Sequence, residues 1–224
     1  MLSIDNKINE LVDETTSNIY DIERLIYTGR YQFIDKDFNL LSKYSLVMLY
    51  SLWEGFIQDL FRMYLEEINT KISLIYELNE RFMLWQIEEK FKQFNEYPEK
   101  EKGKINFQLN LKDFITQTNH ELNTNINCQN NLGFEILNKI LVTFNIDIIP
   151  EHLFPYKHPN RTVKKFLEDL LFHRNNQAHG NNQMANVTIS QSQFIEYKDF
   201  IINMLYEVSL RVLDNLDKQK YLKI

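Results

Sequence analysis

The amino-acid sequence predicts a predominantly α-helical protein, built as a bundle of four to five main helices. Two observations lead to this fold class. Glycine and proline, which interrupt helices, number only 5 and 4 in 224 residues. Apolar residues recur three and four positions apart over long stretches, which is the spacing of a buried helical face. At 44% of the chain, apolar residues also suffice for a sizeable core.

The apolar spacing places the helices along the chain. A first helix covers about 2–27, and a second begins near Asp35 or Asp37 and extends to Asn69. Helical spacing continues from 70 to about 95, and shorter helices follow at 134–144 and about 161–178. A last helix ends near Leu216, and Ser190 with Gln193 forms a capping box at its start. This layout predicts one domain covering 1–224, with a variable, irregular and mostly helical insertion at about 70–131.

Within this insertion, the segment 105–115 has a weak alternation of apolar residues. Ile105, Phe107, Leu109 and Leu111 are two positions apart, which predicts a short strand or an irregular segment. The stretch 96–104 before it is charged and holds both proline and glycine, so we expect a linker there. Residues 116–131 are rich in asparagine and threonine and indicate a loop.

Cysteine content and hydropathy indicate a cytoplasmic protein. The single cysteine, Cys128, excludes an internal disulfide and is typical of a reducing compartment. No apolar run approaches the roughly 18 residues of a membrane-spanning helix, and residues 1–7 lack the pattern of a signal peptide. We therefore expect no membrane association.

The charge distribution allows a local nucleic-acid site and argues against bulk binding. The net charge of −6 disfavours non-specific binding, because counterion release requires basic surface. Residues 156–180, however, hold two acids and five basic side chains: Lys157, Arg161, Lys164, Lys165 and Arg174. This cluster is either an RNA-binding phosphate patch or a chance grouping on a solvated helix face.

The end of the 161–178 helix carries the residues best suited to catalysis. Arg174 can place two hydrogen bonds on phosphate oxygens and stabilise charge in a transition state. His179 titrates near neutrality and can transfer protons to or from ribose and leaving-group oxygens. Asn175 lies four positions before His179 on the same helix face. These are the parts needed to cleave a phosphodiester without a metal.

The spacing of this arginine and histidine is weak evidence when taken alone. With 7 Arg and 5 His in the chain, such a pair arises by chance about half the time. The alternative is a helix C-terminus where Arg174 and His179 only interact with the negative end of the helix dipole.

Two motifs together resemble the HEPN superfamily, in its stand-alone bacterial nuclease form. Arg174-Asn175 followed by Ala178-His179-Gly180 matches the fuller form of the family's arginine–histidine motif. Trp53-Glu54-Gly55-Phe56 looks like the family's Trp-Glu-Gly-Phe signature, on the helix that precedes the variable middle. The resemblance implies a helical bundle, metal-independent ribonuclease activity and a homodimer that brings two motifs into one cleft. Such proteins are often toxins or effectors in prokaryotic conflict and phage-defence systems.

The resemblance assigns catalytic roles to Arg174 and His179, and a supporting polar role to Asn175. Gln177 departs from the family's pattern, in which its position is usually apolar, and this bears on how the last helical turn packs. His173 beside Arg174 either adds to the local positive field or is simply exposed.

The second motif contributes one candidate site residue and three structural ones. Glu54 either orients Arg174 or His179 or belongs to a solvated polar stripe. Trp53 and Phe56 are expected in the core. Gly55 lies mid-helix, where glycine is unfavourable, and this predicts close approach by another backbone element.

No other constellation indicates a cofactor or a metal. His152 with His158, and His173 with His179, are six positions apart, so neither pair shares a helix face. The chain has no glycine-rich phosphate loop, and Cys128 has no paired base in the sequence. We therefore expect no cofactor and no metal.

Two functions remain open at this stage. The first is a metal-independent endoribonuclease that uses the RNA 2′-OH as nucleophile, acts as a homodimer and has an antitoxin or defence-system protein as a partner. The second is a HEPN-like helical module that binds RNA or a protein without cutting.

Overall fold

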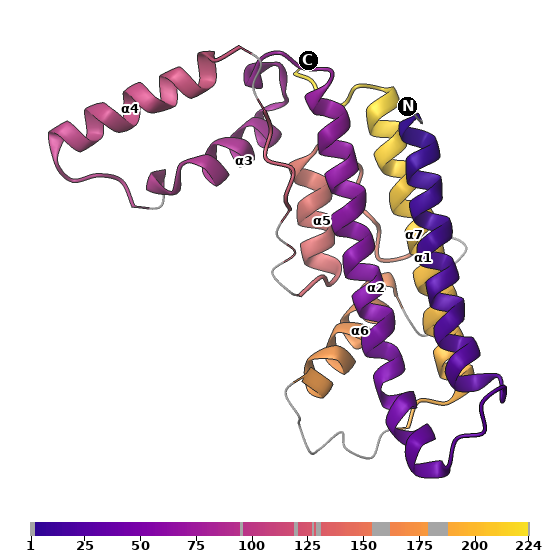
Figure 1. Cartoon of the computed structure of the whole chain (residues 1–224). Coiled ribbons are helices and arrows are strands. Elements are labelled where there is room, and N and C mark those ends of the chain that lie inside the picture. Colours follow the sequence, from indigo (N-terminus) through magenta and orange to yellow (C-terminus); the bar gives the residue numbers. More distant parts are fainter. Residues whose placement is uncertain are drawn as a thin grey trace. The chain divides into compact units, whose positions relative to one another are not determined.

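The structure is a computed structural model that describes residues 3–94, 96–118, 121–126, 128, 131–153, 162–178 and 188–223. Over these residues the chain forms seven α-helices and two 3-10 helices and no strand, which confirms the all-α prediction (Figure 1). The helices are α1 (Ile4–Tyr27), α2 (Asp35–Asn69), η1 (Ile75–Glu77), α3 (Glu80–Lys90), η2 (Lys92–Phe94), α4 (Glu101–Thr116), α5 (Phe134–Thr143), α6 (Val163–Ala178) and α7 (Gln191–Asp217). No helix in the described part combines the length and apolar character that crossing a membrane requires.

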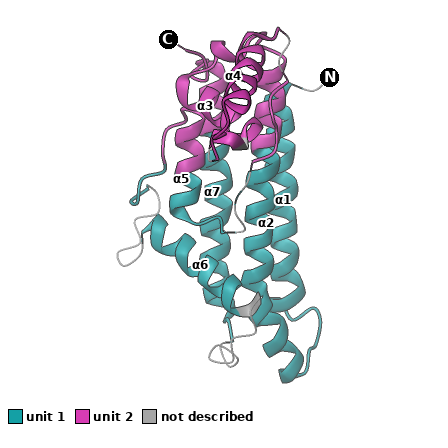
Figure 2. Cartoon of the chain, turned by 90° about the vertical axis from the view of Figure 1, so that its left-hand side faces the viewer, with its two compact units in different colours: residues 1–60, 127–138, 149–210 teal, residues 61–126, 139–148, 211–224 magenta. Residues whose placement is uncertain are grey.

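The chain divides into two compact units, which Figure 2 shows in different colours. Unit 1 consists of Met1–Leu60, Asn127–Asn138 and Ile149–Leu210. Unit 2 consists of Phe61–Ile126, Lys139–Ile148 and Arg211–Ile224. Most of the expected insertion therefore belongs to unit 2, together with segments from outside it. The expectation of one domain with an insertion stays a prediction.

In unit 1, α1 has the capping and the apolar face that its sequence predicts. The Ser3 side chain accepts a hydrogen bond from the Asn6 N–H at 3.4 Å, which satisfies one of the free donors at the helix start. The buried side chains recur at helical spacing: Ile8, Val12, Thr15, Ile19, Ile22 and Ile26. Gly29 follows with a φ of 68°, a left-handed conformation that glycine adopts without strain and that ends the helix.

Side-chain contacts hold α1, α2 and the start of α7 side by side within unit 1 (Figure 1). The Tyr27 hydroxyl donates to the Ile189 carbonyl at 3.1 Å and lies 3.0 Å from the Ser45 hydroxyl. The Tyr27 ring stacks on Phe194 with centroids 5.0 Å apart. The expected capping box at α7 is present, since the backbone N–H groups of Ser190 and Gln193 each bond to the other residue's side chain, at 2.9 and 3.2 Å.

Unit 2 has an aromatic core centred on Phe144. Four rings lie within 5.7 Å of the Phe144 ring, centroid to centroid: Phe61, Tyr64, Phe82 and Trp85. The fully buried Asn215 closes this core with hydrogen bonds. Its Oδ1 accepts from the Tyr64 hydroxyl at 2.8 Å, and its Nδ2 donates to the carbonyls of Phe144 and Asn145 at 3.3 and 2.9 Å.

The prediction for residues 105–115 is wrong, because this segment is the helix α4. Among the described residues of this helix Phe107 is the only buried side chain, and its ring centroid lies 5.9 Å from that of Phe91 and 5.1 Å from that of Phe94. Ile105 and Leu109 are exposed. Half of the alternating apolar residues therefore face away from the core, and their period of two does not describe the buried face. The helix also begins inside the expected charged linker.

Candidate functional site

Two faces of α6 place its side chains toward different neighbours within unit 1. Phe166 stacks on Phe200 of α7, with centroids 4.5 Å apart. His173 lies seven positions later and so on the same face, and its ring meets the Tyr197 ring of α7 edge-on, with centroids 6.3 Å apart. Arg174, one position around the helix, faces α2 instead. His173 and Arg174 thus contact different helices, and a contribution of His173 to the local positive field stays a prediction.

Arg174 lies over the ring of Tyr50 on α2. Its guanidinium carbon is 5.5 Å from the ring centroid, within the range of a cation–π contact. Its Nη1 donates to the Asn175 Oδ1 at 2.9 Å. Both α6 side chains are partly exposed. The structure therefore places Asn175 against Arg174, and it adds Tyr50, which the sequence did not single out.

Tyr50 is held at its ring and at its hydroxyl. The side chain is 1% exposed, and its hydroxyl accepts a hydrogen bond from the Leu132 N–H at 2.7 Å. The same hydroxyl donates to the Glu54 carboxylate at 3.4 Å. Burial, and then the negative charge of Glu54, raises the pKa of Tyr50 above its ordinary value of 10.0. The hydroxyl therefore stays protonated at neutral pH and can donate.

Glu54 contacts Tyr50, the residue beneath Arg174, and does not contact Arg174 itself. Among the described side chains, its hydrogen bond is to Tyr50, and it forms no ion pair with Arg174. It is half-buried, so it is not simply part of a solvated stripe. Trp53 and Phe56 are buried in the core, as expected. The prediction for Gly55 is wrong, because no other element of the described residues comes within 4 Å of the position that a Cβ would take there.

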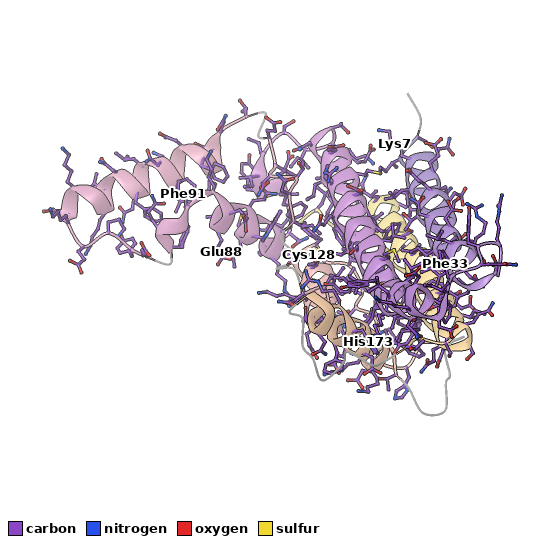
Figure 3. The ribbon with its side chains drawn as sticks, turned by 60° about the horizontal axis from the view of Figure 1, so that its bottom comes forward. Lys7, Phe33, Glu88, Phe91, Cys128 and His173 are labelled. Carbon is purple, nitrogen blue, oxygen red and sulfur yellow. The ribbon has the colours of Figure 1, made fainter. Side chains whose placement is uncertain are left out.

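Cys128, labelled in Figure 3, lies close enough to the same part of α2 to interact with Glu54 and Gln58. Its side chain is 2% exposed, and it hydrogen-bonds with Gln58, one helical turn beyond Glu54. Burial, and then the charge of Glu54, raises the pKa of the Cys128 thiol to about 11, against the lowering effect of the Gln58 hydrogen bond. A thiol that resists ionisation is a poor nucleophile, in keeping with the sequence interpretation.

The basic side chains near the start of α6 are paired with acids. Lys164 forms an ion pair with Glu135 at 2.7 Å and lies 4.0 Å from Glu168, and its pKa is raised mainly by the Glu135 hydrogen bond. Lys165 pairs with Asp169 at 2.8 Å. These carboxylates offset the positive charge that the sequence suggested for an RNA-binding patch.

Three predicted site residues, Lys157, Arg161 and His179, lie outside the described residues. The described ranges contain no group of three or more His, Cys, Asp or Glu side chains arranged to hold a metal ion.

Sequence reasoning missed Tyr50 and the backbone N–H of Leu132. A partial signal for the first was available, since Tyr50 precedes Glu54 by four positions and shares its helix face. The second contact depends on a backbone group 82 positions away from Tyr50. No local sequence pattern predicts it.

One family comparison covers almost the whole chain. A family model described as HEPN_MAE_28990-like HEPN matches residues 3–221. No curated protein and no solved structure matches the chain significantly.

Proposed function

Because the chain belongs to the HEPN family, we propose that it is a metal-independent endoribonuclease with its site at the end of α6. HEPN domains are commonly ribonucleases or have nucleotide-related functions. Arg174 and His179 of this chain resemble the arginine and histidine of the family motif. The observation that carries the proposal is the placement of Arg174. Its guanidinium is partly exposed and lies on a buried aromatic ring with Asn175 beside it.

The proposed reaction follows from the chemistry of these side chains. The ribose 2′-oxygen attacks the adjacent phosphorus, and the bond from phosphorus to the 5′-oxygen breaks. His179 takes the 2′-OH proton or gives a proton to the leaving 5′-oxygen. Arg174 binds the phosphate oxygens and stabilises the charge that grows on them. The products are a 2′,3′-cyclic phosphate and a 5′-hydroxyl, so the substrate is RNA and not DNA.

Asn175 has a narrower role in this proposal. Its Oδ1 accepts from Arg174, which limits the directions in which the guanidinium can point. Its amide N–H groups can donate to a phosphate or to a base. Asn175 therefore orients the arginine, the substrate or both.

The proposal includes the assembly and setting that the resemblance implies. The active form is a homodimer in which two copies of the Arg174–His179 motif share one cleft. The protein acts in the cytoplasm as a toxin or effector of a prokaryotic defence system, with an antitoxin or other partner protein that controls it. The single cysteine is compatible with a reducing compartment.

Incubation of the purified protein with labelled RNA in EDTA tests the proposed activity. We expect cleavage that leaves 2′,3′-cyclic phosphate and 5′-hydroxyl ends, and no cleavage of the same oligonucleotide with 2′-deoxy sugars. His179→Ala and Arg174→Ala should each abolish cleavage without changing the circular dichroism spectrum. Absence of cleavage by the wild-type protein in every RNA and buffer tested would sink the proposal.

Matched variants show whether a loss is specific to the motif. His152 is exposed, and Arg24 lies on α1 in an exposed ion pair with Asp21. His152→Ala and Arg24→Ala remove the same side-chain types and should leave cleavage unchanged. Size measurement by light scattering tests the dimer, and a strict monomer with full activity contradicts that part of the proposal.

The ion pairs of Lys164 and Lys165 favour a second candidate, a HEPN-like module that binds without cutting. With these charges offset, less basic surface is available for a long RNA, and a protein ligand becomes more favourable. Binding of RNA or a protein by the wild type, unchanged in His179→Ala and without cleavage, would support this candidate.

A further inference from the structure

Tyr50 connects the two sequence motifs. It contacts Arg174 of the arginine–histidine motif and bonds Glu54 of the Trp53–Phe56 motif. Tyr50 lies one helical turn before Glu54 on α2, and Arg174 lies near the end of α6. The ring is 1% exposed, whereas the guanidinium above it is partly exposed. A buried ring therefore supports one side of a cation that reaches the surface.

The Tyr50 ring cannot easily change its position, because its hydroxyl is fixed twice. The backbone N–H of Leu132 donates to it at 2.7 Å, and it donates to Glu54 at 3.4 Å. The segment that provides the Leu132 N–H also contacts α6. A Cβ on Gly133 would lie 3.4 Å from the Leu171 side chain, so backbone and helix are already close there. Within unit 1, each of three elements therefore contacts the other two: Tyr50, the 131–133 segment and α6.

The charges around this set favour a fixed arginine. A guanidinium is planar and weakly hydrated, so it stacks on an aromatic face and keeps its edge N–H groups free to donate. Glu54 lies behind the hydroxyl, and the described side chains form no ion pair with Arg174. The cation is therefore oriented by an aromatic ring and an amide, and neither neutralises its charge.

We propose that Tyr50 is a positioning residue for Arg174, with Glu54 acting on the arginine through the Tyr50 hydroxyl. The ring sets the plane of the guanidinium, Asn175 sets its rotation within that plane, and the remaining N–H groups meet a phosphate of the substrate. This inference rests on the proposed ribonuclease function. It adds to the motif a residue on α2 that touches no reacting atom.

Cleavage kinetics of three variants test the inference. Tyr50→Leu removes the ring, so Arg174 keeps its charge but its guanidinium is no longer held in one orientation. We therefore expect kcat to fall about tenfold while KM changes less than twofold. Tyr50→Phe keeps the ring but loses the hydroxyl that bonds Leu132 and Glu54, so its kcat should lie between those of Tyr50→Leu and the wild type. Tyr206, exposed on α7, provides the matched control, and Tyr206→Leu should cleave like the wild type. Wild-type kcat in Tyr50→Leu would overturn the inference.

A spectroscopic measurement tests the contact without relying on activity. In protein with ¹⁵N-labelled arginine, the Arg174 Hε resonance, assigned by its loss in Arg174→Lys, should carry a ring-current shift. The shift should persist in Tyr50→Phe and disappear in Tyr50→Leu. An NOE between the Tyr50 ring and the Arg174 side chain is expected in the wild type. Its absence overturns the inference even if Tyr50→Leu does not fold.

The two readouts also separate the inference from the function on which it rests. If the wild type cleaves RNA and Tyr50→Leu does so equally well, only the role of Tyr50 is refuted. If the wild type cleaves no RNA, the ribonuclease function fails, and with it the catalytic meaning of the contact. The ring-current shift then still reports whether the ring holds the arginine.

Discussion

The rate of chemical labelling of Cys128 reports on its neighbours, because the charge of Glu54 contributes to the pKa of the thiol. The chain has no other cysteine, so the labelling signal comes from this residue alone. Alkylation by iodoacetamide requires the thiolate. Raising the thiol pKa from its ordinary 9.0 to about 11 lowers the thiolate fraction at neutral pH about 100-fold. Burial of the side chain slows access of the reagent further. We therefore expect native Cys128 to react at least about 100-fold more slowly than the same residue in the urea-unfolded chain.

Two neighbouring variants should change this rate in opposite directions. Glu54→Gln removes a negative charge that raises the Cys128 pKa, so labelling should become faster. Gln58→Leu removes the hydrogen bond that lowers the pKa, so labelling should become slower. Mass spectrometry of the single adduct between pH 7 and 9, with circular dichroism as the folding control, gives the rates. A native rate within about tenfold of the unfolded rate, or slower labelling in Glu54→Gln, would refute this account of the cluster.

The same shift has a consequence for stability. The folded-state pKa of Cys128 lies above the unfolded value, so the folded chain holds the thiol proton more tightly. This contribution to stability is fully present below about pH 9 and is lost as the pH rises through about 11. A Cys128→Ala variant should therefore lose less stability than the wild type over this interval in urea titrations.

Other predictions concern stability and activity. Gly55→Ala should stabilise the protein by about 0.5–1 kcal/mol, because nothing obstructs a Cβ within this helix. Gly29→Ala, also unobstructed, should destabilise it by about 1 kcal/mol through its φ of 68°. In urea unfolding, a loss of stability in Gly55→Ala contradicts the first prediction, and a gain of stability in Gly29→Ala contradicts the second. Asn215→Leu removes the partner of two buried groups, the Tyr64 hydroxyl and the Phe144 carbonyl, and of the part-buried Asn145 carbonyl. It should cost about 3 kcal/mol, and more than Tyr64→Phe, which breaks only one of these bonds. Arg174→Lys loses the planar fork and its stacking, so RNA cleavage should fall at least about tenfold, and full activity would argue against both contacts.

The long helices could be predicted because their buried faces are determined by the sequence itself. The predicted span of α2 agrees with Asp35–Asn69, since apolar residues recur without interruption between an acidic first turn and a polar end. The capping box of Ser190 and Gln193 is similarly local, with both partners three positions apart. Such features depend on neighbours along the chain and not on packing.

The α4 helix could not be predicted in the same way. Its strongest visible pattern was the alternation from Ile105 to Leu111, but the side chains that face neighbouring rings are Phe107 and Phe114, seven positions apart. Spacing by seven is helical, yet it is hidden when exposed apolar residues such as Ile105 and Leu109 lie between. The buried face of α4 is therefore defined by the contacts of Phe107 and Phe114 with Phe91, which is distant in sequence.

In the candidate site, too, some features follow from local sequence and others depend on tertiary contacts. Arg174 and Asn175 are adjacent in sequence and were both identified from the motif, but the hydrogen bond between them was not expected. The Tyr50 contact joins positions 124 apart, so no local pattern encodes it. Glu54 was identified from its motif as a residue that could orient the arginine, but its contact with Tyr50 depends on a hydroxyl that only the folded chain places beside it.

The shared support of Arg174 constrains how this sequence can diverge. In a relative where Arg174 is replaced, an aromatic ring at position 50 has no guanidinium to contact. Selection to keep Tyr50, and with it Glu54, should then relax at the same time. The Leu132 N–H would then lose its acceptor unless another polar side chain replaced the tyrosine. Relatives without the arginine should therefore differ at positions 50 and 54 together, whereas relatives that keep it should retain an aromatic residue at 50.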